Sequence, residues 1–154
     1  MSVSSLDGSH QADDWLLAGA PLADPLGPDL PSGVHRVRSR SATSTLVPAL
    51  ERAGWATTVV DLAGALDKST VLEAFARSLA FPAWVGHNWD ALDDALRDLS
   101  WWPAGRRGRV IVVRGAGRTA TTVPRVLETL RDVLVRAGNR WAVTDTPLVV
   151  LVRR

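Results

Sequence analysis

The sequence of 154 residues contains no cysteine and only three histidines. Without cysteine, the chain has no disulfide, no thiol nucleophile and no thiolate ligand for a metal. No apolar run reaches the roughly 18 residues that a membrane-spanning helix requires. The N-terminus also lacks the basic and apolar regions of a secretion signal. We therefore expect a cytoplasmic protein that does not contact a membrane.

Motifs of common catalytic centres are missing as well. The chain has neither the G-x-S-x-G of a nucleophile elbow nor the H-E-x-x-H of a zinc hydrolase. The three histidines, His10, His35 and His87, have no evident nucleophile partner in the sequence. The stretch Gly115-Ala116-Gly117 lacks the third glycine of a dinucleotide fingerprint and the lysine of a P-loop, so it indicates an ordinary turn. We expect no catalytic residue, no cofactor and no metal site.

Apolar patterning predicts a small α/β domain. The expected strands cover 33–39, 55–62, 109–114 and 147–152, and the expected helices cover 44–53, 70–80, 88–99 and 122–138. Strands joined through helices run parallel, with right-handed crossovers. We therefore expect a mostly parallel sheet of three to four strands flanked by helices, in which 59–62, 110–113 and 148–152 are parallel.

The first 32 residues differ in composition from the rest. They contain four prolines, and only Trp15-Leu16-Leu17 is locally apolar, which is typical of a segment without a core of its own. The predicted organisation is a flexible N-terminal tail over 1–32 and one α/β domain over 33–154. Within that domain, the strand and helix before residue 55 form an extra unit, which we expect to add an edge strand to the sheet.

Residues at the ends of the apolar stripes predict how the helices begin and end. Asn88 is expected to cap the helix that follows it, and Thr70 with Glu73 to form a capping box. Gly138 is expected to end the last helix. Of the adjacent Trp101 and Trp102, we expect one to be buried and the other exposed.

Three carboxylates crowd the short helix after Asn88. Asp90, Asp93 and Asp94, here called the acidic triplet, are spaced i, i+3 and i+4. At about 100° per residue they share an arc of roughly 100°, and we expect this arc to lie opposite the apolar stripe. Repulsion between like charges at this spacing costs a few tenths of a kcal/mol per pair. Such a face is typical of a solvated helix, and it is also what a surface that binds a cationic partner requires.

Two other functions stay open as alternatives. Residues 103–154 carry 11 basic and 3 acidic side chains, so a basic C-terminal third offers a nucleic-acid-binding module as one alternative. A metal-dependent hydrolase is a weaker one, because it would have to assemble Asp90, Asp93, Asp94, Asp98 and His87 without a second ligand cluster on another element. We expect binding to nucleic acid to be weak and non-specific.

The segment Phe81–Asp94, F-P-A-W-V-G-H-N-W-D-A-L-D-D, carries a family resemblance. It resembles the signature of the barstar family, the intracellular inhibitors of barnase-type ribonucleases. The residues that fall at the family's spacing are Pro82, Gly86, Asn88, Asp90, Ala91, Leu92 and Asp94. The resemblance extends over roughly Thr57 to Arg154 and implies the barstar fold.

The resemblance also implies roles for individual residues. Asp94 occupies the position of the central aspartate that mimics a substrate phosphate, and Asp90 that of a second contact with the nuclease active site. Trp84 stands where the family has an aromatic that packs on the nuclease, and Asn88 matches as well. Asp132, on the last long helix, falls where the family has an acidic contact.

Two positions depart from the founding member of the family. Asp93 replaces an aromatic residue, and Arg136 stands where that member has another acid. With Asp93 included, the expected partner-binding residues are Trp84, Asn88, Asp90, Asp93, Asp94 and Asp132. The function implied is a non-enzymatic inhibitor of immunity or antitoxin type. It would block the cationic active site of a secreted or toxin ribonuclease of the barnase type, as a monomer in a 1:1 complex.

Overall fold

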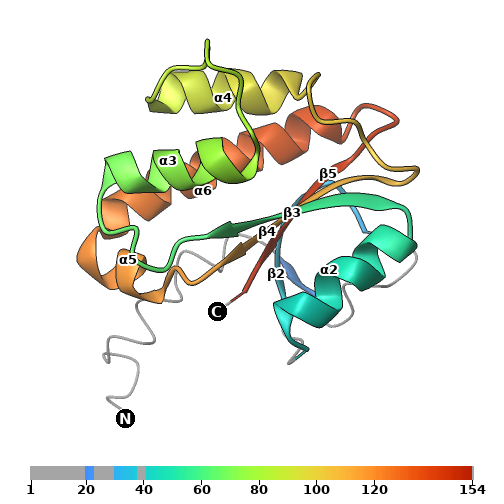
Figure 1. The fold of residues 1–154 in the computed structure, drawn as a ribbon, viewed down its shortest axis with the longest axis horizontal. Coiled ribbons are helices and arrows are strands. Elements are labelled where there is room, and N and C mark those ends of the chain that lie inside the picture. The colour runs from blue at the N-terminus through green and yellow to red at the C-terminus, as the bar shows by residue number, and fades with distance from the viewer. Residues whose placement is uncertain (1–19, 23–29, 38–40, 154) are drawn as a thin grey trace.

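The computed structural model describes residues 20–22, 30–37 and 41–153. Figure 1 shows a twisted parallel sheet between two layers of helices, with α2 on one face and α3 to α6 on the other. The strands are β1 Ala20–Leu22, β2 Gly33–Val37, β3 Trp55–Asp61, β4 Gly108–Arg114 and β5 Leu148–Val152. The helices are α2 Thr43–Arg52, α3 Lys68–Ser78, α4 Trp89–Asp98, α5 Gly117–Thr122 and α6 Pro124–Trp141.

The strands are ordered β1-β2-β5-β4-β3 and all neighbours are parallel. The prediction that β3, β4 and β5 lie parallel in one sheet is confirmed, with Val112 opposite Val59 on one side and Leu151 on the other. The sheet has five strands because the three-residue β1 joins its edge. The last strand in the chain, β5, occupies the centre.

Alternating side chains of the central strands build two apolar cores. Val110 and Val112 of β4 face α2, where they pack with Leu46 and Leu50. Ile111 of β4 faces the opposite way, into the larger core built with α3, α4 and α6. A strand covered on both faces has no polar side, which explains why β4 and β5 read as continuous apolar runs. The helix that carries the acidic triplet thus belongs to the larger of the two cores.

The described parts of the N-terminal segment are built into the domain, in contrast to the predicted tail. Ala20–Leu22 pairs with β2 through its backbone, and Leu30 is buried. The Ser32 hydroxyl donates to the Gly138 carbonyl at 2.8 Å and accepts from the Leu148 amide at 3.1 Å. Residues 1–19 and 23–29 of the predicted tail lie outside the described residues. The strand and helix before residue 55 were expected to add an edge strand to the sheet. The strand of this unit, β2, instead lies inside the sheet, between β1 and β5.

Several predicted helix ends are wrong. α3 begins at Lys68, and the capping box joins Asp67 to Thr70, whose amide donates to the Asp67 carboxylate at 2.8 Å. Glu73 takes no part in that box, because the helix begins before its apolar stripe and Thr70, not Glu73, is the third residue after the cap. α2 follows Ala42, which provides no side-chain cap.

Trp101 and Trp102 are both partly buried, so neither is fully exposed, in contrast to the prediction that one of them is.

Gly138 does not end α6, which continues to Trp141. A Cβ atom at residue 138 would lie 2.5 Å from the Gly33 Cα atom, a distance that real Cβ contacts do not reach. The glycine is required because α6 crosses the start of β2 with no room for a side chain between the two backbones. Close packing of helix on strand therefore explains this glycine, and helix termination does not.

Candidate functional site

The N-terminal end of α4 is fixed by Asn88. Its side-chain oxygen accepts the Ala91 amide at 2.8 Å, which confirms the predicted cap. One face of the helix inserts Leu92 and Leu96 into the larger core, where both are fully buried. The cap and the apolar face together set the direction of the helix and the rotation about its axis. The polar side chains of α4 are therefore held in fixed directions.

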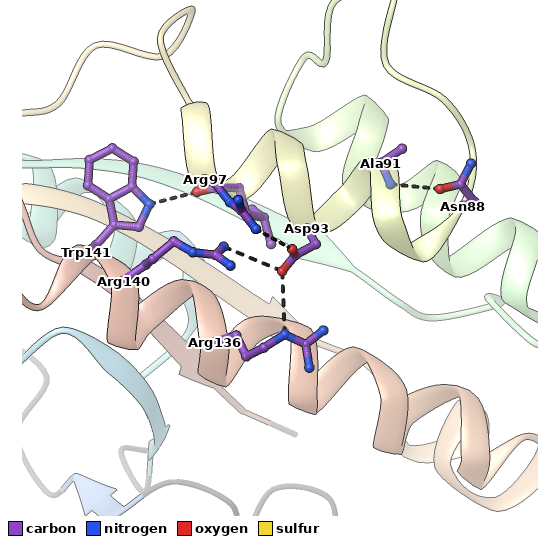
Figure 2. Close-up of polar contacts among 8 residues, drawn as sticks. Asn88, Ala91, Asp93, Arg97, Arg136, Arg140 and Trp141 are labelled. Atoms are coloured by element: carbon purple, nitrogen blue, oxygen red, sulfur yellow. Dashed lines mark hydrogen bonds and ion pairs between the residues drawn. The ribbon is translucent and has the colours of Figure 1, made fainter.

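The C-terminal end of α4 is held by two donors from elsewhere in the chain. The Trp141 indole Nε1 donates to the Leu96 carbonyl at 2.7 Å. Figure 2 shows this indole pointing toward α4. Arg109 donates through Nη2 to the Leu99 carbonyl at 3.3 Å and through Nε to the Trp102 carbonyl at 2.7 Å. Burial lowers the pKa of Arg109, and a cation placed here also stabilises the negative end of the helix dipole. Both ends of α4 are thus anchored.

The acidic triplet does not form one exposed face, in contrast to the prediction. α6 packs along one flank of α4, and Asp93 points toward it (Figure 2). Its carboxylate accepts from Arg97 at 3.1 Å and lies 3.7 Å from Arg136 Nε and 3.6 Å from Arg140 Nη1. The Asp93 side chain is only 17% exposed. The helical pattern placed Asp93 at the edge of the polar arc, and the neighbouring helix covers that edge.

Asp90 and Asp94 are the exposed members of the triplet. They are called the acidic pair below. Their spacing of one helical turn puts both carboxylates on the same flank of α4. No ion pair within the described residues engages either one. The acidic pair therefore offers two uncompensated negative charges on a helix that is held at both ends.

Trp84 stands on the loop before α4 and is 68% exposed. Its ring makes an edge-to-face contact with Trp101, with centroids 6.0 Å apart. Trp101 is itself fixed, because its Nε1 donates to the Leu79 carbonyl at 3.0 Å and its ring contacts Phe81. An exposed indole supported in this way is a large apolar contact surface of defined position, next to the capped start of α4.

Asp132 lies on the exposed face of α6, 3.5 Å from the guanidinium of its neighbour Arg131. α4 and α6 run in the same direction in Figure 1, and Asp132 precedes Arg136 by one turn. Because Arg136 is level with Asp93, Asp132 lies toward the N-terminal end of α4. The predicted residues thus lie around the start of α4. The exception is Asp93, which pairs with arginines of the same chain.

The sequence analysis missed the arginines that surround Asp93. Arg136 and Arg140 are spaced i, i+4 on α6, as are Asp93 and Arg97 on α4, and these two matched spacings are the only signal that the sequence carried.

No group of three or more His, Cys, Asp or Glu side chains in the described ranges is arranged to hold a metal ion. Among the helices described, none is long and apolar enough to cross a membrane.

Comparison with known proteins identifies the family of the chain. A family model described as Barstar (barnase inhibitor) matches residues 55–153. No curated protein compared with the chain matches it. The matched segment begins at β3 and contains α4, α6 and β5, so it includes the whole candidate surface and covers well over half of the sequence. The chain belongs to the barstar family, whose members are inhibitors and not enzymes.

Proposed function

We propose that this protein inhibits a barnase-like ribonuclease by placing α4 in the cationic active site of that enzyme. The observation that carries the proposal is the exposed acidic pair on a helix anchored at both ends. A ribonuclease active site is cationic because it must bind phosphates and stabilise a charged transition state. Carboxylates held at fixed positions replace those phosphates and accept charge-assisted hydrogen bonds from arginine or lysine.

The proposed contact surface consists of Trp84, Asn88, Asp90, Asp94 and Asp132. Within it, Asp94 takes the role of the central phosphate mimic, Asp90 is the second acidic contact, and Trp84 packs on the rim of the nuclease. Asp93 is not proposed as a direct contact, because three arginines of the same chain surround it. The complex contains one inhibitor and one nuclease.

The alternative of a nucleic-acid-binding module has little support in the arrangement of the basic residues. Arg109 is buried between indole rings, and Arg114 pairs with Asp61 at 3.0 Å. Arg106 and Arg107 donate to the Ala53 carbonyl on another side of the domain. These four cations serve contacts within the fold. The metal-dependent alternative has no cluster of ligands in the described residues.

The test is a titration of barnase with the wild-type protein and with Asp94→Ala, measured by calorimetry and by RNA hydrolysis. We expect the wild type to inhibit barnase at a 1:1 ratio and Asp94→Ala to bind at least 100-fold more weakly, because a desolvated cation of the nuclease is left unpaired. Asp145→Ala is the matched control, since Asp145 is also exposed but lies in the loop before β5.

Thermal unfolding of the same variants separates binding from stability. Asp94→Ala is expected to unfold at the wild-type temperature or slightly above it, because removing one of two neighbouring like charges relieves repulsion. Equal inhibition by wild type and Asp94→Ala would contradict the proposal. So would a wild-type protein that leaves barnase fully active, or an Asp94→Ala variant that fails to fold.

A further inference from the structure

Three guanidinium groups converge on one carboxylate where α4 packs against α6 (Figure 2). Arg97, Arg136 and Arg140, called the cationic ridge below, lie 3.1, 3.7 and 3.6 Å from the Asp93 carboxylate. Three positive charges against one negative charge leave the group with a net charge of +2. The contact between the two helices therefore keeps an excess of positive charge beside the acidic pair.

The cationic ridge also keeps hydrogen-bonding capacity. A guanidinium group has five N–H donors, and Asp93 accepts a hydrogen bond only from Arg97 among the described residues. Arg140 Nη1 and Asp93 Oδ1 are buried atoms 3.6 Å apart, so the capacity for a further anion lies on the exposed parts of Arg97 and Arg136. The side chains of Arg97 and Arg136 are 52% and 55% exposed. A second anion thus has accessible positive charge to bind.

The cationic ridge lies close enough to the acidic pair for one interface to cover both. At 100° per residue, Arg97 lies roughly 20° from Asp90 around the axis of α4. The distance between them along the axis is about 10 Å. A specific protein interface covers on the order of 800 Å² of each partner, which is enough to include both. A nuclease that receives Asp90 and Asp94 therefore also faces Arg97 and the neighbouring arginines of α6.

We infer that the cationic ridge binds a carboxylate of the partner nuclease, next to the cationic cleft that receives the acidic pair. The inference rests on the proposed function. Arginine binds carboxylate through paired, charge-assisted hydrogen bonds, whereas a cation opposite the ridge would be repelled. The inhibitor surface has both signs of charge, and the ridge selects nucleases that carry an acid at this point of the rim. A nucleic-acid strand fits less well than a single carboxylate, because it carries a phosphate at every nucleotide and its further phosphates would meet Asp90 and Asp94.

The first experiment measures affinity for barnase and for a set of barnase variants. Each variant has one lysine or arginine around the active-site rim replaced by glutamate. At least one of these variants is expected to bind the wild-type inhibitor tenfold more tightly than unmodified barnase does. That gain is expected to vanish with Arg136→Glu and to persist with Arg125→Glu, an exposed arginine at the other end of α6. The inference is overturned if no variant gains affinity or if the gain survives Arg136→Glu.

A second experiment needs no nuclease. In an NMR titration, tetra-aspartate is expected to shift the Nε–Hε signals of Arg97, Arg136 and Arg140, while a short single-stranded RNA leaves them in place. No shift with tetra-aspartate, or a larger shift with RNA, overturns the inference. Failure of the proposed function has different signatures, namely no inhibition of barnase or inhibition that does not depend on Asp94, whatever the titration of the cationic ridge gives.

Discussion

The indole of Trp141 supplies the hydrogen bond that the carbonyl of Leu96 cannot obtain within its own helix. Leu96 lies in the last turn of α4, where backbone carbonyls have no intrahelical donor. The two residues are 45 positions apart in the sequence, so the bond joins the end of α6 to the end of α4. The position of the acidic pair therefore depends on a tryptophan that does not belong to the proposed contact surface.

Replacing Trp141 with phenylalanine removes this donor and keeps an aromatic ring. We expect a loss of about 1–2 kcal/mol in the free energy of unfolding, because the partly buried carbonyl is left without its partner. Affinity for barnase is expected to fall as well, since the end of α4 is less well fixed. Urea denaturation and calorimetry measure the two effects. Trp84→Phe is the control for stability, because Trp84 is exposed and its change should stay within about 0.5 kcal/mol.

Asp93 and Asp94 are adjacent in sequence and are expected to respond in opposite ways to the same substitution. Asp93→Asn leaves Arg97, Arg136 and Arg140 without their shared carboxylate, and we expect a loss of roughly 1–2 kcal/mol, since the arginines are partly exposed. Asp94→Asn is expected to leave stability unchanged or slightly raised. Denaturation in low salt and in about 1 M salt checks the cause, because screening should shrink the Asp93 effect. An equal effect of both substitutions would contradict this assignment.

Gly138→Ala tests the close approach of α6 to β2. Alanine is favoured over glycine by about 1 kcal/mol inside a helix, but its Cβ atom would meet the Gly33 Cα atom at 2.5 Å. We expect a net loss of more than about 2 kcal/mol, because a backbone must move. Gly117→Ala is the matched control, since its added Cβ meets nothing within 4 Å. A variant at residue 138 as stable as the wild type would show that α6 has room to shift.

The Asp67 cap predicts a change of stability with pH. Hydrogen bonds from the Thr70 backbone, and then from its side chain, lower the pKa of Asp67 below its ordinary value of 3.8. A lowered pKa in the folded state means that the carboxylate stabilises the protein fully above pH 3.8 and loses this effect as pH falls through the lower folded-state pKa. Asp67→Asn keeps a capping oxygen that does not titrate. The stability difference between wild type and Asp67→Asn is therefore expected to shrink from pH 7 to about pH 3, measured by urea denaturation.

The sequence predicted those features that arise from local chemistry. The run Arg109–Arg114 fixed β4 to within one residue, because a strand covered on both faces must be apolar throughout. Asn88 identified the start of α4, because only a few residue types cap a helix. The resemblance at Phe81–Asp94 then led to the family that the comparison confirms.

Features that depend on two distant segments were not predictable in the same way. Asp93 lies on the polar arc of α4, and only the position of α6 shows that it points inward. Gly138 follows an apolar stripe as a terminating glycine would, and its contact with Gly33 becomes visible only when helix and strand are placed together. The strand Ala20–Leu22 joins the sheet through backbone pairing, which leaves little trace in three side chains.

The central position of β5 has a consequence for synthesis on the ribosome. β2 and β4 each use β5 as a neighbour, so neither can complete its hydrogen bonds until residues 148–152 have left the exit tunnel. Until then, the edge of each strand that later pairs with β5 keeps unpaired backbone N–H and C=O groups. The sheet that supports the proposed contact surface is then complete only after β5, the last strand in the order of synthesis, has been made.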